Sequence, residues 1–148
     1  MKNLFLFSFI LFAILACKKE SNSEYAQDDS QQGFNGRWKL VESRVSPGDQ
    51  NYIVTDKTKD NIILHFKSAG KVSSSQFPCE GDFKYYEEMQ EKNLFPYNLS
   101  ISFSCRRKNS NVDEEEWKIK AEFKDNNTLY IYNTRCIEGC SEMYRRLK

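Results

Sequence analysis

The sequence predicts an all-β protein, an antiparallel up-and-down barrel of eight strands, and three observations lead to it. Eight tyrosines and eleven phenylalanines, together with many Ile, Val and Thr residues, favour strands over helices. Several segments alternate apolar and polar residues with a period of two. Short loops that carry Gly or Asn separate these segments, as hairpin turns do. A barrel removes exposed strand edges by closing on itself, and a two-sheet sandwich is the alternative.

The clearest strands have one face for a core and one face for water. Ile62, Leu64 and Phe66 share one face of the predicted strand 61–67. The same alternation runs through 98–105 and 114–124, where the outward positions are serines or charged residues. The span 50–57 is expected to hold a short extra turn or an entry loop. The full set of predicted strands is 37–45, 61–67, 71–77, 82–90, 98–105, 114–124, 128–133 and 141–147.

The start of the chain has the pattern of a secretory signal. After a short basic start, an apolar run from Leu4 to Ala16 ends directly before Cys17. The ending Ile14-Leu15-Ala16-Cys17 resembles the lipobox of bacterial lipoproteins, in which the chain is cut before the cysteine and that cysteine is acylated. The apolar run covers roughly 20 Å, well short of a ~30 Å membrane core. We therefore expect Cys17 to anchor the protein through lipid rather than a helix that spans the membrane.

These features divide the chain into three parts. Residues 1–16 are expected to be a lipoprotein signal peptide, 17–33 a lipidated cysteine and flexible tether, and 34–148 the barrel. The tether is polar and could not bury enough surface to offset its chain entropy. Cleavage removes Lys2 and leaves equal numbers of basic and acidic residues, which argues against a nucleic-acid partner. The expected location is the cell envelope, at the outer membrane, on its periplasmic or surface face.

Four cysteines remain once Cys17 is assigned to the anchor, and an even number in an exported domain predicts two disulfides. Three pairings are possible. We favour Cys136 with Cys140, because the intervening residues can turn and bring two Cα atoms within ~6–7 Å. Cys79 would then pair with Cys105. A zinc site would need a tighter Cys pair or histidines, and His65 is the only histidine.

Parts of the predicted barrel resemble a known family. Gly36-Arg37-Trp38 is similar to the G-x-W opening strand of lipocalins. The segments Ile63–Val72 and Cys136–Leu147 resemble a hairpin and the closing strand of the lipocalin-like domain lipoproteins of Bacteroidota. The resemblance covers roughly residues 34–148 and implies the same barrel. It also implies that Trp38 packs at the closed barrel end under a basic residue, Arg145 or Arg146.

The sequence offers no catalytic group. His65 is predicted to point outward, no G-x-S-x-G elbow surrounds the serines, and no glycine-rich phosphate loop is present. We therefore expect a protein that is not an enzyme and that uses no cofactor or metal.

The remaining expectation is binding. The predicted inner face either fills the core or lines a cavity for a small apolar ligand, and its candidate residues are Leu40, Leu64, Phe66, Ile101, Phe103, Ile119 and Phe123. The alternative is a protein-binding or inhibitor module on the cell envelope. Tyrosines are common at such interfaces, and the exposed aromatic candidates are Tyr52, Tyr85, Tyr86, Phe95, Tyr97, Tyr130 and Tyr132.

Overall fold

The computed structural model describes residues 24–26, 33–48, 51–92, 95–108, 115–134, 136 and 139–148. Within these ranges the chain forms nine β-strands, and a three-residue 3-10 turn, η1 (Ser68–Gly70), joins two of them. The strands are β1 (Gly36–Val45), β2 (Ile53–Asp56), β3 (Ile63–Phe66), β4 (Lys71–Ser74), β5 (Glu80–Lys92), β6 (Phe95–Phe103), β7 (Glu115–Asp125), β8 (Thr128–Asn133) and β9 (Cys140–Arg146).

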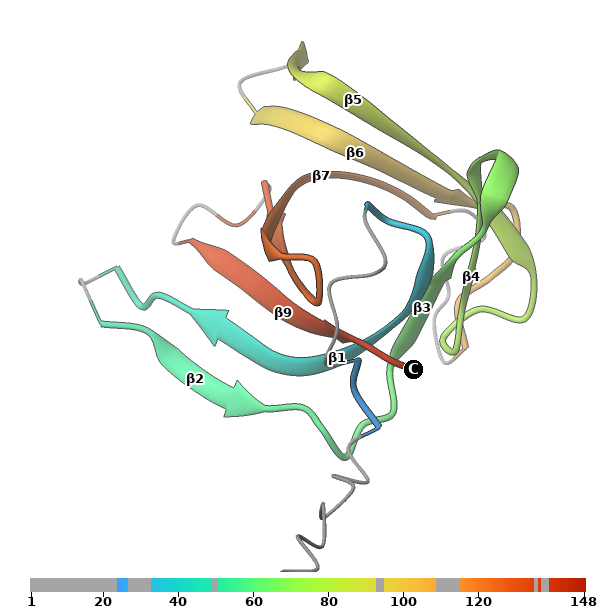
Figure 1. Ribbon diagram of the computed structural model, residues 1–148. Coiled ribbons are helices and arrows are strands. Elements are labelled where there is room, and N and C mark those ends of the chain that lie inside the picture. Colours follow the sequence, from blue (N-terminus) through green and yellow to red (C-terminus); the bar gives the residue numbers. More distant parts are fainter. Residues whose placement is uncertain are drawn as a thin grey trace, which may run out of the picture.

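Eight of the strands close into a barrel, as the alternation predicts. From β3 to β9 each strand pairs antiparallel with the next one in the chain, and β1 pairs with both β3 and β9. The closing register places Trp38 opposite Arg146 and Leu40 opposite Tyr144. Figure 1 shows β1 and β9 side by side, with the long β5–β6 hairpin on the other side of the view. The prediction of an antiparallel up-and-down, eight-stranded barrel is confirmed.

One strand, β2, lies outside the eight-stranded barrel. It corrects the expectation of a turn or entry loop over 50–57. It pairs antiparallel with the second half of β1, while β3 pairs with the first half, so both lie along the same edge of β1 (Figure 1). Backbone hydrogen bonds from Lys57 to Val41 and from Leu40 to Ile62 link the two pairings. All four β2 residues are exposed. Because no face of β2 is buried, the segment lacks the alternation that reveals the other strands.

The strand β5 extends beyond the prediction of 82–90 and includes Glu87–Lys92, a segment of helical propensity. Its partner β6 holds it in the extended form, with Phe83 opposite Ile101 and Tyr85 opposite Leu99. The pairing then shifts register between Tyr85 and Gln90. Strand pairing therefore overrides local propensity in this part of the chain.

An asparagine side chain continues the sheet between β6 and β7. Asn98 is buried, its Nδ2 donates to the carbonyl oxygen of Ala121 at 2.9 Å, and its Oδ1 accepts from the Ala121 backbone N–H at 2.7 Å. The side-chain amide thus takes the place of a backbone peptide beyond the last paired residues, Leu99 and Ile119. Both backbone groups of Ala121 are satisfied in this way.

Three residues of the predicted tether pair with the end of the barrel. Tyr25 forms a bridge with Leu147, and the backbone of Ala26 donates to Arg146 at 2.9 Å. Glu24 accepts a hydrogen bond from the Lys39 ammonium at 2.8 Å. Residues 24–26 of the predicted tether therefore lie against the barrel. The predicted signal peptide and the predicted lipidation site, Cys17, lie outside the described residues.

Candidate functional site

Both predicted disulfides are present in the structure. Cys79 is bonded to Cys105, with Cα atoms 6.0 Å apart, and Cys136 is bonded to Cys140, with Cα atoms 5.6 Å apart. The first bond joins the segment before β5 to the segment after β6, and its two cysteines pack against the hydrophobic core. The second bond closes the local turn before β9.

The inner face of the barrel gathers all seven predicted lining residues into one hydrophobic cluster. Six of them are buried, and Phe123 is partly buried against the other six. The cluster also contains inner-face residues that the sequence did not single out as lining, among them Phe34, Val72, Phe77, Phe83, Leu129 and Tyr144. Phe83 could have been found from its alternation with Asp82 and Lys84, whereas Phe34 lies before β1 and carries no such signal.

One end of the barrel, which we call the sealed end, is filled by aromatic rings. The Phe34 ring centroid lies 5.2 Å from that of Phe66, 4.8 Å from that of Phe123 and 5.1 Å from that of Tyr85. Tilted and edge-on rings at such distances attract one another beyond the effect of area burial. Phe34 therefore acts as a plug that the segment before β1 inserts into the barrel.

Arg146 completes the sealed end. Its guanidinium carbon lies 4.2 Å from the centroid of the Trp38 ring, and both side chains are fully buried. The guanidinium donates to the carbonyl oxygens of Asn126 at 2.9 Å, of Gly33 at 2.6 Å and of Asn35. Burial lowers the pKa of Arg146 from its ordinary value. Of the two arginines expected above Trp38, Arg146 is the one that lies over its ring.

Further along the inner face of β1 and β9, polar side chains replace the apolar ones. Ser43 lies directly opposite Glu142, one pair beyond the bulge that follows the pair Leu40–Tyr144. Glu142 also lies opposite Ile131, a core residue, so its side chain belongs to the inner face. We call Ser43, Glu142 and Tyr144 the Glu142 cluster. It places a carboxylate on the inner wall, next to the core residue Ile131.

Within the Glu142 cluster, the phenol of Tyr144 donates to Oε2 of Glu142 at 2.7 Å. Tyr144 is buried, and burial, followed by the charge of Glu142 and this hydrogen bond, raises the pKa of its phenol well above the ordinary value. The charge of Arg107 acts on the same phenol in the opposite direction. The Tyr144 hydroxyl therefore stays protonated and orients the Glu142 carboxylate.

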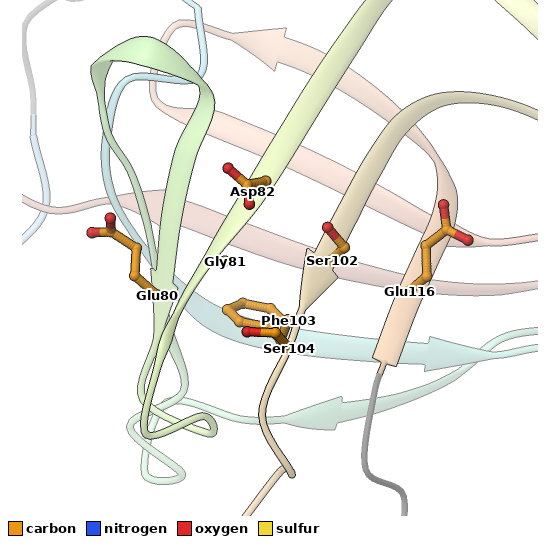
Figure 2. A pocket seen from close by; sticks show the side chains of 7 residues that line it. All are labelled: Glu80, Gly81, Asp82, Ser102, Phe103, Ser104 and Glu116. Carbon is orange, nitrogen blue, oxygen red and sulfur yellow. The ribbon is translucent and has the colours of Figure 1, made fainter.

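A hollow lies on the outer face of the barrel, across β5, β6 and the start of β7. This hollow of about 250 Å³ is lined by Glu80, Gly81, Asp82, Ser102, Phe103, Ser104 and Glu116 (Figure 2). Each carboxylate is paired with a lysine: Glu80 with Lys67 and Asp82 with Lys71, both at 2.5 Å, and Glu116 with Lys118 at 3.0 Å. The hollow thus has little uncompensated charge, and the carboxylate–lysine pairs give no reason to assign it chemistry.

Gly81 permits a close approach of β5 to β6 at this hollow, and replacing it with alanine is expected to destabilise the protein by about 1–3 kcal/mol. A Cβ at this position would overlap the carbonyl oxygen of Ser102 and would lie 2.7 Å from the Phe103 ring. Urea unfolding of the Gly81→Ala variant measures the loss. The exposed Ser102→Ala change is the control, expected within about 0.5 kcal/mol of the wild type. An equally small effect of Gly81→Ala would contradict the close approach.

No group of three or more His, Cys, Asp or Glu side chains that could hold a metal ion is found in the part of the chain that the structure describes. The described residues also include no helix long and apolar enough to cross a membrane.

The fold and the sealed end define the class of protein: a closed, eight-stranded, up-and-down β-barrel with an apolar inner face, consistent with a lipocalin-like fold. No protein-family model matches the chain, and no match is found among curated proteins or solved structures.

Proposed function

We propose that this protein is an extracytoplasmic, lipid-anchored, lipocalin-like protein that binds a small apolar ligand on the inner face of its barrel without catalysis. The observation that carries the proposal is the single hydrophobic cluster inside a closed barrel, with an arginine and a phenylalanine sealing one end. Pockets for small molecules are mostly apolar and carry few polar groups. The inner face of this barrel has both features: most of its residues are apolar, and the Glu142 cluster adds a few polar groups.

Two further features support an exported, anchored protein. The lipobox-like sequence ends at Cys17, and two disulfides suit an oxidising compartment. The pairing of Tyr25 with Leu147 leaves only residues 18–23 between Cys17 and the first paired residue, Glu24. Fully extended, those residues reach roughly 20 Å. An acylated Cys17 would therefore hold the barrel close to the membrane surface.

Ligand binding is tested by native mass spectrometry of the protein purified from its own host, and by titration with a fluorescent fatty-acid probe. We expect a co-purifying apolar species and saturable probe binding that a substitution of the inner wall, Leu64→Glu, abolishes. His65→Glu, which adds the same charge at the neighbouring position of β3, is the control. The absence of both a bound species and probe binding would overturn the ligand proposal.

The anchor is tested separately by metabolic labelling with palmitate. Label is expected on the wild type and not on a Cys17→Ser variant. An unlabelled wild type would overturn the anchor and leave ligand binding standing.

The second candidate function is binding of another protein, and β2 favours it. Tyr52, Ile53 and Val54 are 57%, 60% and 54% exposed, and β2 pairs with β1 along one of its edges. Exposed apolar residues on such a strand suit pairing with an added strand of a partner. An empty barrel together with a partner whose binding an Ile53→Lys change abolishes would support this function instead.

A further inference from the structure

From the free edge of β2 we infer that this protein pairs with a second copy of itself, with the two β2 strands joined antiparallel into one continuous sheet. The pairing is centred on Val54 of both copies. This inference goes beyond ligand binding and does not depend on it. It gives a specific occupant to the strand on which the second candidate function rests.

The strand β2 has one neighbour and one free edge. Among the strands that the structure describes, β2 pairs only with β1, and Figure 1 shows it at the margin of the sheet. The backbone hydrogen bond from Lys57 to Val41 joins directly opposed residues, so Lys57 and, two positions earlier, Thr55 turn their N–H and C=O groups toward β1. Val54 and Asp56 therefore turn theirs toward the free edge, where an added strand can bond to them.

Exposed apolar side chains gather on the same hairpin. Six large apolar residues are exposed in the described part of the chain; two lie on β5, and four lie on β1, on β2 or directly before β2. The four are Val45, Tyr52, Ile53 and Val54. Exposed apolar residues on a free strand edge invite association. Because each β2 has one free edge, the pairing of two copies uses this edge in both and stops there.

The sequence of β2 is complementary to itself in one antiparallel register. With a two-fold axis at Val54, Tyr52 of each copy lies opposite Asp56 of the other, and Ile53 lies opposite Thr55. This register uses the outward backbone groups of Tyr52, Val54 and Asp56, and no two like charges are directly opposed. An axis at Thr55 or Asp56 would instead bring the two Asp56 carboxylates together on one face.

The pairing of residues 24–26 with the barrel suits a dimer of anchored chains. Glu24 pairs with Lys39, and the Arg145 guanidinium carbon lies 5.9 Å from the centroid of the Tyr25 ring. Lys39 and Arg145 are opposed residues on the outer face of β1 and β9. A two-fold axis perpendicular to the sheet keeps this face on the same side in both copies, so two chains anchored as proposed could share one membrane.

The dimer is expected to be weak in solution. About five residues a side take part, compared with about 20–30 a side in a standard interface. Attachment of both copies to one membrane would raise their effective concentration and favour the pairing.

The register is tested by cysteine cross-linking of the full chain in membranes of its own host. At the two-fold axis the two Val54 Cα atoms would lie about 5.5 Å apart, which a disulfide can span. We expect mild oxidation to convert Val54→Cys to a dimer on a non-reducing gel. Asp56→Cys is the matched control, because the two positions would lie about 13 Å apart along the strand and should not cross-link.

A second measurement needs no added cysteine. Sedimentation of the purified wild type in detergent, from about 1 μM to about 1 mM, should show a monomer that converts to a dimer. Val54→Lys places two like charges opposite each other and is expected to weaken the dimer about 10-fold or more. Met89→Lys makes the same change at an exposed residue of β5 and should not.

The outcomes separate this inference from the proposed functions. A wild type that stays monomeric, a dimer that survives Val54→Lys, or equal cross-linking of Val54→Cys and Asp56→Cys would overturn the pairing through β2. None of these results bears on the apolar ligand. A monomeric wild type that loses another protein partner on Ile53→Lys would leave the second candidate function standing without the dimer.

Discussion

Replacing Arg146 with alanine is expected to lower the free energy of unfolding by about 2–4 kcal/mol. The change removes a guanidinium that donates to three backbone carbonyls and covers the Trp38 ring at 4.2 Å. A hydrogen bond from a charged donor contributes about 1.5–3 kcal/mol, and a desolvated cation over an indole about 0.5–2 kcal/mol. The sum is reduced because the carbonyls of Gly33 and Asn35 belong to exposed residues and regain water. Urea unfolding, followed by tryptophan fluorescence, measures the loss.

Two variants make the Arg146 experiment specific. Arg146→Lys keeps the positive charge but loses the planar guanidinium with its several N–H donors. We therefore expect its stability to lie between those of Arg146→Ala and the wild type. Arg37→Ala removes an exposed arginine of β1, next to Trp38 in the sequence, and should stay within about 0.5 kcal/mol of the wild type. If Arg146→Ala cost no more than Arg37→Ala, the account of the sealed end would be wrong.

Removing the Cys79–Cys105 disulfide is expected to destabilise the protein by about 3–4 kcal/mol, compared with about 2 kcal/mol for Cys136–Cys140. The physical reason is the size of the loop that each bond closes in the unfolded chain. The sequence separations are 26 and 4 residues, and the entropy of an open loop rises with its length. The pairs Cys79→Ser with Cys105→Ser, and Cys136→Ser with Cys140→Ser, allow the two losses to be measured by urea unfolding.

The order of the two disulfide effects is the decisive result. If the two double variants lost equal stability, or if the Cys136–Cys140 variant lost more, loop entropy in the unfolded chain would not explain the effect. The contribution of each disulfide would then come from the native state. The wild type treated with a reductant serves as a control, because it should lose about as much stability as the two double variants together.

The alternation of single residues was sufficient to predict the barrel. Side chains on successive strand residues point to opposite faces, so the apolar set Leu64 and Phe66, or Ile101 and Phe103, could be read as an inner face before any pairing was known. The same reading failed for Ile53–Asp56. All four residues of β2 are exposed. A strand without a buried face does not need alternating apolar and polar residues, so its sequence shows no period of two.

The candidate site was predictable only in part. The seven lining residues follow from the alternation, and all lie in the hydrophobic cluster. The plug of Phe34 depends on where the chain enters the barrel, which no local pattern encodes. The inward position of Glu142 depends on the register of β9 against Ser43 and Ile131. Sequence reasoning passes over a charged residue in a short closing strand, because charges usually face water.

The amino-acid sequence by itself determined that this chain is all-β and roughly where eight of its strands run, because side-chain period and turn residues are local properties, and it favoured the cysteine pairing that the structure shows. Only the tertiary structure decided that β2 lies beside β1, that Phe34 and Arg146 seal one end of the barrel, and that a carboxylate stands on the inner wall. Each of these depends on residues far apart in the chain that meet only when the register of the closing strands is set.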